Sequence, residues 1–164
     1  MTKNILLDRL CDFTLDATSD IIMPVKRQKE DKEDPEPRAA DVYRMRLPDS
    51  KSATKKAPYV LHQIITGKDI QPDGRLESAS ATVRTIFCVY SDDEQEGGLM
   101  LLNLMERFRI KLLREVIIGD QFQLDLESGL ESLIYPDDTA PFFAGEMVSV
   151  WKMPSVEREV RKWL

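Results

Sequence analysis

Residues 82–126, TVRTIFCVYSDDEQEGGLMLLNLMERFRIKLLREVIIGDQFQLDL, decide the fold class. The stretch opens with an extended segment that is apolar on both sides, passes through an acidic turn, and closes with an alternating apolar and polar segment. Between these segments Leu101, Leu104 and Phe108 recur at helical spacing, which predicts a long helix over about 97–115. Strand, helix and strand in this order predict a helix packed on a sheet.

Further apolar segments of strand length lie on both sides of this stretch. A short helix is predicted over residues 4–18, where apolar positions again follow helical spacing. We therefore predict a single domain, 1–164, of α+β class, with a mixed, mainly antiparallel sheet, a long amphipathic helix packed on one face and a short N-terminal helix. The predicted strands cover residues 40–48, 58–71, 80–91, 121–127 and 142–154.

Two charge-rich segments interrupt this pattern. KRQKEDKEDPEPR at 26–38 and DSKSATKKA at 49–57 bury too little apolar area to offset the entropy lost on ordering, so both are predicted to be mobile loops. The extended segments beside them predict hairpins whose tips project. Lys51, Lys55 and Lys56 make the second loop basic, which suits contact with an acidic surface or with passing nucleic acid, or a plain solvated loop.

Composition narrows the classes of function. The formal net charge of −6 argues against a general nucleic-acid coat, because phosphate binding needs a cationic surface. The N-terminus resembles no secretory signal, and no apolar run is long enough to span a membrane, so we expect a soluble protein made in a reducing compartment. The two cysteines, Cys11 and Cys88, are then expected to be small buried hydrophobes.

Few side chains could carry catalysis. His62 and Cys88 each lie inside a predicted strand without a partner at ligand or catalytic spacing, so both are interpreted as packed strand residues. The acidic residues of 92–96 lack the spacing of a calcium loop, although Asp137 and Asp138 could join them around a metal ion. We predict no enzyme activity, cofactor or metal site, and keep a cytosolic metal- or ligand-binding protein as an alternative.

Surplus apolar residues point instead to contacts with other chains. The apolar positions of the long helix cover more than the arc of roughly 100° that a sheet-packing helix uses. A deeply buried helix and a helix shared with a neighbouring subunit both fit this pattern. The apolar tail at 155–164, with helical spacing of its apolar residues, either folds back on its own core or docks on a partner. The candidate interface residues are Leu99, Met100, Ile110, Val160, Trp163 and Leu164.

Short runs within residues 59–154 carry a resemblance to known proteins. These runs are EQEG at 94–97, NLMERFR at 103–109, IIGDQF at 117–122, and G-x-M-x-x-x-W-x-x-P at 145–154. Together with the order of the predicted elements, they resemble the small neck and tail proteins of long-tailed phages and prophages. The best match within that class is the tail terminator (tail completion) group. None of the runs is a catalytic signature.

This resemblance implies a structural virion protein. Members of the group assemble as a ring, usually a hexamer, that caps the tail tube, ends its polymerisation and offers a surface to the head-side connector protein. DNA only passes through such a ring, and neither a membrane nor a cofactor is involved. The resemblance places the protein in the tail or neck of the virion, assembled in the cytoplasm of the bacterial host. A closed ring needs two different contact patches, for which the long helix and the tail are candidates. Another head–tail joining or tail-assembly protein is the nearest alternative.

Overall fold

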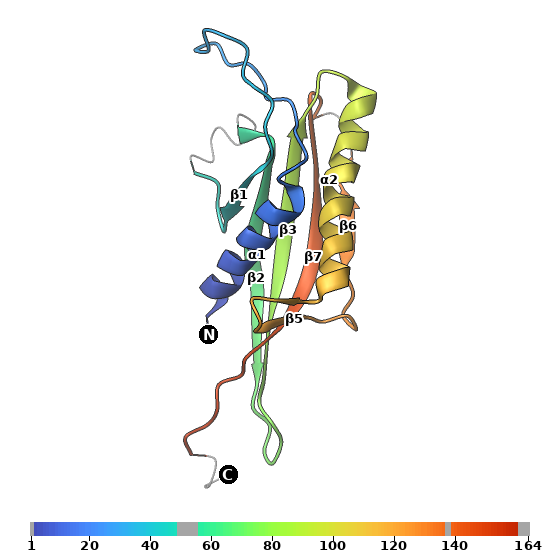
Figure 1. The fold of residues 1–164 in the computed structure, drawn as a ribbon. Helices are drawn as coiled ribbons and strands as arrows, with labels where there is room; N and C mark the ends of the chain where they lie inside the picture. The colour runs from blue at the N-terminus through green and yellow to red at the C-terminus, as the bar shows by residue number, and fades with distance from the viewer. Residues whose placement is uncertain (1, 49–55, 137–138, 161–164) are drawn as a thin grey trace.

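Two long antiparallel strands form the centre of the sheet. In the computed structural model, β3 (Ser78–Tyr90) pairs with β7 (Phe142–Met153) along nearly its whole length, and β2 (Tyr59–Ile70) pairs with the other edge of β3. The β2–β3 hairpin extends beyond the rest of the sheet, toward the bottom of Figure 1. The structure describes residues 2–48, 56–136 and 139–160.

Four short strands complete the sheet. β1 (Asp41–Arg44) runs parallel to β2, whereas β5 (Phe122–Leu124) and β6 (Glu131–Ile134) both pair antiparallel with β7. β4 (Ile117–Ile118) pairs antiparallel with β5, so the strand order is β1-β2-β3-β7-β5-β4, with β6 also on β7. The predicted α+β class and the mixed, mostly antiparallel sheet are confirmed.

Two helices, α1 (Lys3–Thr18) and α2 (Glu94–Glu115), cover one face of the sheet (Figure 1). Their contact is built on aromatic rings: Phe108 of α2 meets Phe13 of α1 edge-on, with 5.7 Å between ring centroids, and Phe87 of β3 at 5.6 Å. Edge-to-face pairs of this kind stabilise a core beyond the area that they bury. Neither of the described helices combines the length and the apolar character that a bilayer crossing requires.

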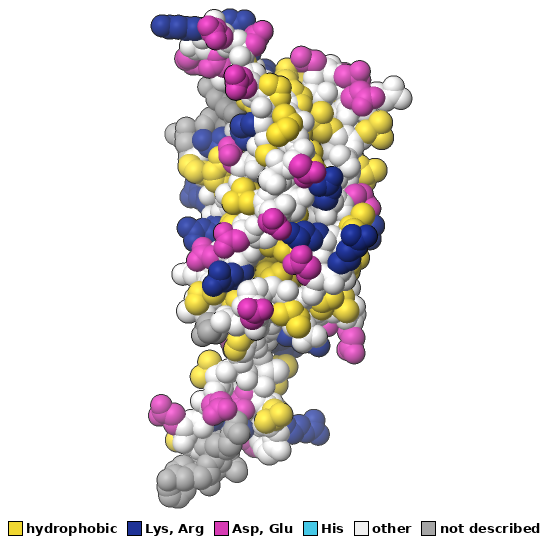
Figure 2. All heavy atoms as spheres, in the orientation of Figure 1, with side chains coloured by type: hydrophobic (Ala, Val, Ile, Leu, Met, Phe, Trp, Pro, Cys, Tyr) yellow, Lys and Arg dark blue, Asp and Glu magenta, His cyan; other side chains and the backbone are white. Residues whose placement is uncertain are grey.

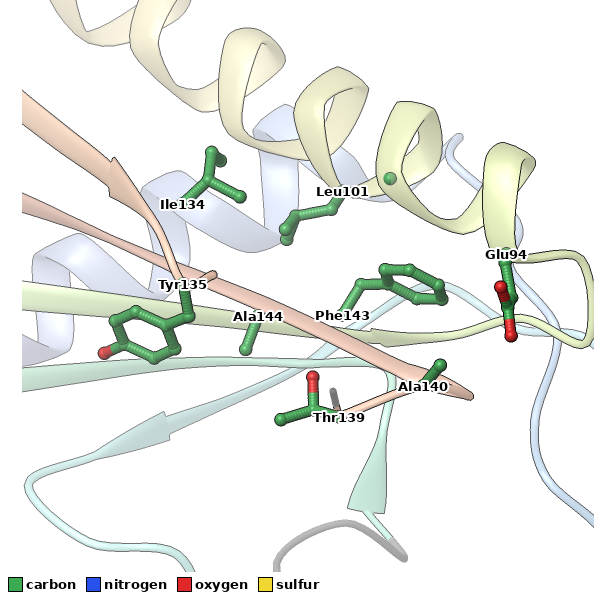
Figure 3. A pocket seen from close by; sticks show the side chains of 9 residues that line it. Glu94, Leu101, Ile134, Tyr135, Thr139, Ala140, Phe143 and Ala144 are labelled. Atoms are coloured by element: carbon green, nitrogen blue, oxygen red, sulfur yellow. The ribbon is translucent and has the colours of Figure 1, made fainter. Parts of the chain in front are cut away.

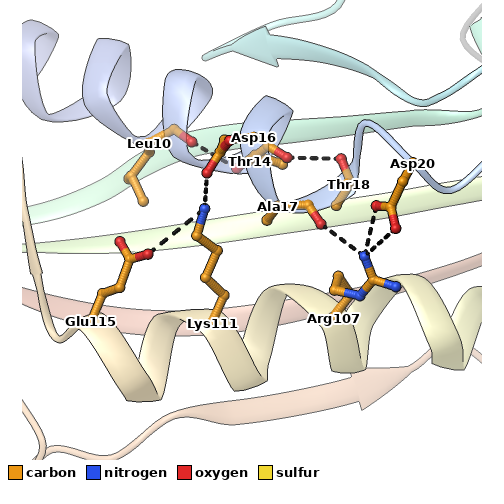
Figure 4. A network of polar contacts seen from close by, with 9 residues as sticks. All are labelled: Leu10, Thr14, Asp16, Ala17, Thr18, Asp20, Arg107, Lys111 and Glu115. Carbon is orange, nitrogen blue, oxygen red and sulfur yellow. Dashed lines mark hydrogen bonds and ion pairs between the residues drawn. The ribbon is translucent and has the colours of Figure 1, made fainter.

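Charged side chains join α2 to α1 and to the turn after it (Figure 4). Arg107 donates to both carboxylate oxygens of Asp20, at 2.7 and 2.9 Å, and these bonds lower the pKa of Asp20. Lys111 pairs with Asp16 and, at 3.7 Å, with Glu115 of its own helix. Solvent screens exposed ion pairs, so they contribute little, and the buried aromatic contacts stabilise the helix pair more strongly.

The start of α2 lies three residues ahead of the predicted start at about 97. Its N-cap is Asp93, whose carboxylate accepts from the backbone N–H groups of Gln95 at 3.0 Å and Glu96 at 3.1 Å. The helix therefore begins at Glu94, ahead of the two glycines that obscure its start in the sequence.

We expect Asp93→Ala to lower the free energy of unfolding by about 1 kcal/mol, because two helix N–H groups lose their acceptor. Asp93→Asn is the matched control, since its side-chain oxygen can still accept both bonds while the charge is removed. Urea unfolding of the two variants measures the difference. Equal destabilisation by both would show that the charge, rather than the hydrogen bonds, stabilises the helix start.

Several sequence-based expectations about the strands and the tail are wrong. β1 ends at Arg44, short of the predicted boundary, because Met45 has a φ of 59°, in the left-handed region that an extended strand does not use. β1 and β2 are parallel, so the connection that contains the second charged loop is a crossover rather than the tip of a hairpin. β4 and β6 are not predicted from the sequence. The tail at 155–160 forms no helix despite its apolar spacing.

Candidate interaction surface

α2 presents apolar residues to solvent as well as to the core. On its outer side Leu99 and Leu102 are 57% and 47% exposed, and Ile110 and Leu113 are 40% and 39% exposed. Figure 2 shows apolar side chains alternating with charged ones along the right-hand margin of the molecule, where α2 lies. The buried positions on the opposite side of the helix are Gly97, Leu101, Leu104, Met105, Phe108 and Leu112.

An ion pair divides these exposed apolar residues. Arg109 donates from Nε to Glu106 Oε1 at 2.9 Å and from Nη2 to Oε2 at 2.7 Å, and both side chains stay partly exposed. The pair lies between Leu102 and Leu113, at alternating spacings of three and four residues that align all of them on one side of the helix. Ile110 flanks this line. We define the outer stripe of α2 as Leu99, Leu102, Glu106, Arg109 and Leu113.

Not all of the α2 residues that were predicted to contact a partner are exposed in the structure. Leu99 and Ile110 are exposed, but Met100 is half-buried and packs against the core, so it is not available as a free contact residue. Leu102 and Leu113, which were not among the candidates, are exposed as well. The signal that identifies them is the alternation of three and four residues along the outer stripe, which runs beside the core pattern.

The C-terminal segment docks on the tip of the β2–β3 hairpin. Arg158 donates from Nη1 to the carbonyl of Gln71 at 3.1 Å, from Nη2 to the carbonyl of Pro72 at 3.0 Å, and from Nε to the Glu77 carboxylate at 3.2 Å. Gln71 Nε2 in return donates to the carbonyl of Val156 at 3.1 Å. The Arg158 side chain is only 11% exposed. We define the arm as residues 65–77 and 154–160.

The arm carries exposed apolar side chains. Leu76 is 80% exposed, and Val156 and Val160 are also exposed. In the structure, residues 154–160 lie on the tip of the β2–β3 hairpin of the same chain and not on the core, and docking of the tail on a partner stays a prediction. Trp163 and Leu164 lie outside the described residues.

We expect Arg158→Ala to release the tail from the hairpin, because one side chain supplies three of its contacts to the tip. Hydrogen bonds to a charged group contribute about 1.5–3 kcal/mol, so a protease that cleaves after glutamate should cut the tail at Glu157 or Glu159 about tenfold faster or more. Limited proteolysis measures this rate. Arg75→Ala, at an exposed position of the same tip, is the matched control and should leave the rate unchanged. An unchanged rate in the Arg158 variant would contradict the docking.

A pocket of about 470 Å³ opens between α2 and the adjoining ends of β6 and β7 (Figure 3). Leu101 and Phe143 point into the space between helix and strands, and Glu94 lies at one end. The hydroxyl of Tyr135 donates to Glu146 at 3.0 Å. Among the described lining residues there is one carboxylate and no His, Cys or Lys, so the pocket offers apolar contact with a single charge at its end. The described lining residues are Glu94, Gly98, Leu101, Ile134, Tyr135, Thr139, Ala140, Phe143 and Ala144.

The interpretation of His62 and Cys88 as packed strand residues is confirmed. His62 is fully buried, with Nε2 at 2.7 Å from Thr14 Oγ1 and Nδ1 at 2.8 Å from Thr85 Oγ1. Burial raises the pKa of the Cys88 thiol to about 11, which leaves little reactive thiolate at neutral pH. Cys11, half-buried on α1, has its pKa raised to about 11 by the same cause.

The acidic residues do not gather around a common point in the part of the chain that the structure describes. Within residues 2–48, 56–136 and 139–160, no group of three or more His, Cys, Asp or Glu side chains could hold a metal ion. Asp137 and Asp138, which the metal alternative requires, lie outside these ranges.

The two charged loops differ in how they are anchored. Met23 and Arg38 exchange two backbone hydrogen bonds, of 2.8 and 3.0 Å, that close the base of the first loop, which projects from the body at the top of Figure 1. In the second, Lys56 is half-buried and its carbonyl accepts from Arg38 Nη2 at 3.0 Å. Lys51 and Lys55 lie outside the described residues, so their predicted contacts stay predictions.

The comparisons with known proteins add no assignment. No protein-family model matches this chain, and a search of curated proteins finds no match. The surfaces described above are therefore the basis for a functional proposal.

Proposed function

We propose that this chain is a structural subunit of a long-tailed phage or prophage, a tail terminator that caps the tail tube as a ring. In this role it ends polymerisation of the tube and presents a surface to the head-side connector protein. The proposed partners are further copies of the chain, the tail tube protein and the connector protein, with DNA only passing through. The proposal joins the sequence resemblance to the contact surfaces of the molecule.

The arm is the observation that carries the proposal. It extends beyond the sheet, is held in one conformation by Arg158, and exposes Leu76 and Val156 at a distance from the core. A projection of this kind contacts a surface unlike itself on the next subunit, which makes the contact heterologous. Heterologous contacts build a closed ring when the rotation between subunits closes, and a filament when it does not.

The residues that carry the resemblance bear mainly on the fold. Met147 and Trp151 of the last run lie on β7 and are buried in the core. The NLMERFR run also contributes three buried side chains, from the inner side of α2: Leu104, Met105 and Phe108. The resemblance therefore supports a shared core, while the proposed contacts between ring subunits rest on the arm. For this reason the test of the proposal addresses the contacts.

Light scattering across a concentration series tests the ring. We expect the unmodified chain to form one discrete closed oligomer, a hexamer above all. Leu76→Asp should weaken it at least about tenfold, because a carboxylate would replace an apolar side chain that is buried on assembly. Leu15→Asp is the matched control, since Leu15 is also an exposed leucine but lies near the C-terminal end of α1, outside the arm. An oligomer unaffected by Leu76→Asp would contradict the role of the arm.

The biological role is tested separately in a phage that carries this gene. Deletion should give tails of irregular length without attached heads, which electron microscopy measures. Tails of normal length in the deletion strain would contradict the terminator function, whatever the oligomer in solution.

A further inference from the structure

We infer that the outer stripe of α2 pairs antiparallel with the outer stripe of a second copy, around a two-fold axis. This inference does not rest on the proposed function, because it uses only the residues of α2. In it the stripe is an interface between two copies of the chain rather than a solvated helix face.

The order of residues along the stripe is self-complementary. With the two helices antiparallel and the axis between positions 107 and 108, Leu102 lies opposite the partner's Leu113, and Glu106 lies opposite the partner's Arg109. Leu102 and Leu113 then meet each other across the axis and each charge meets the opposite charge, while Leu99 lies at the end of the contact, beyond the partner's stripe. In a contact of this isologous kind residue i meets residue j and residue j meets residue i. The spacing of three and four residues along the stripe is the spacing of a coiled-coil seam.

The Glu106–Arg109 ion pair at the centre of the stripe favours a second copy of α2 as the partner and the antiparallel orientation of that helix. A parallel pair of stripes would set Glu106 beside Glu106 of the partner subunit and Arg109 beside its own counterpart, so like charges would repel. An antiparallel pair shifted by one heptad would set a charge against a leucine. The antiparallel, centred arrangement alone satisfies both carboxylates and both guanidinium groups, which already form bidentate bonds within one helix, at 2.7 and 2.9 Å.

The stripe is rigid and accessible. Its residues lie on a helix whose other side is anchored by Phe108 and Leu104, both buried, so pairing requires no rearrangement of the backbone. From Leu99 to Leu113 the stripe spans 15 residues, or about 21 Å of helix. A contact of this length is smaller than a standard stable interface, so the association should depend on concentration rather than be permanent.

This contact is distinct from the one that closes a ring. In a polar ring all subunits point the same way, and a two-fold contact cannot join neighbours within it. Pairing through α2 therefore joins two free subunits, or subunits of two rings that face each other. The arm and the outer stripe can be tested independently for this reason.

Charge reversal and mixing test the inference. In the Leu76→Asp background, in which the arm-dependent oligomer is weakened, the chain should increase in mass from monomer towards dimer with concentration, as measured by sedimentation or light scattering, and the charge variants are made in this background. Glu106→Arg and Arg109→Glu should each weaken this pairing at least tenfold, because each places like charges opposite one another. An equimolar mixture of the two variants should restore it, since every Glu again faces an Arg. Arg114→Glu changes the charge equally on the same helix but off the stripe, and should leave pairing intact.

Cross-linking tests the register. In a background without Cys11, the double variant Leu102→Cys and Leu113→Cys should form a disulfide-linked dimer on mild oxidation, and Leu102→Cys alone should not, because two copies of position 102 lie far apart. A chain that is monomeric at every concentration overturns the inference. So does pairing that is unchanged by Glu106→Arg and Arg109→Glu, or a mixture that fails to restore it. Loss of pairing in these variants, with the Leu76-dependent oligomer retained when the same charge changes are made in the unmodified chain, leaves the proposed function standing.

Discussion

Replacing Phe108 by alanine is expected to lower the free energy of unfolding by about 3–5 kcal/mol. The Phe108 ring is buried, and it contacts Phe13 of α1, Phe87 of β3 and, at 5.8 Å between centroids, His62 of β2. Alanine would leave a cavity at the point where both helices and the sheet meet. The surrounding rings come from three other elements, α1, β2 and β3, so they cannot all move to fill it.

Urea unfolding followed by far-ultraviolet circular dichroism measures this loss. The matched control is Asn103→Ala, an exposed position on the same helix, which should change the stability by less than about 0.5 kcal/mol. A loss below about 1 kcal/mol for Phe108→Ala would contradict the packing described for the helix pair.

Acidification is expected to destabilise the protein through His62. Thr14 Oγ1 donates to the carbonyl of Leu10 at 2.7 Å, so it must accept from His62, which assigns the proton to Nε2. Nδ1 then accepts from the hydroxyl of Thr85. The neutral ring is fully satisfied, and burial lowers the pKa of His62 from 6.5 to about 3.

The sign of the effect follows from linkage. Between pH 6.5 and about 3 the unfolded chain binds a proton on this histidine and the folded chain does not, so stability is complete above pH 6.5 and falls as the pH is lowered through this range. Each pH unit costs up to about 1.4 kcal/mol, which gives a loss of up to about 3 kcal/mol at pH 4.5.

The His62→Gln variant isolates this contribution. Glutamine has an amide donor and a carbonyl acceptor but no titration in this range, so its stability should fall less steeply between pH 6.5 and 4.5 than that of the unmodified chain. Unfolding midpoints across this pH range measure the two slopes. Equal slopes would contradict the burial of a neutral histidine, because the carboxylates common to both chains would then explain the whole effect.

Periodicity predicts the long elements of this fold and misses the short ones. The repeat of Leu101, Leu104 and Phe108 identifies α2 because one side of the helix faces a sheet over its full length. β6 has four exposed residues, so burial imposes no alternation on its sequence, and only its pairing with β7 makes it a strand. The parallel pairing of β1 with β2 depends on the path of the crossover, which local sequence does not encode.

The sequence likewise identifies some residues of the candidate interaction surface and misses others. Leu99 and Ile110 stand out in the sequence because they fall outside the main apolar stripe of the helix. Leu102 and Leu113 border that stripe, and apolar spacing does not reveal where the buried arc ends. The docking of Arg158 on the hairpin depends on two turn carbonyls, of Gln71 and Pro72, that only the folded chain brings to the tail.

The position of β6 has a consequence for handling the protein. Tyr135 donates its backbone N–H to Ala144 of β7, so alternation in the antiparallel register turns the backbone groups of Ser132 and Ile134 away from β7. Within the described residues no strand pairs with that outer edge, which is apolar at Leu133 and Ile134. Such an edge is a template for amyloid-like addition of strands from other chains, limited here by its short length and by Pro136. Concentrated samples are therefore prone to edge-to-edge association. The substitution Ile134→Lys places a charge on this edge strand and should reduce the turbidity that develops on storage.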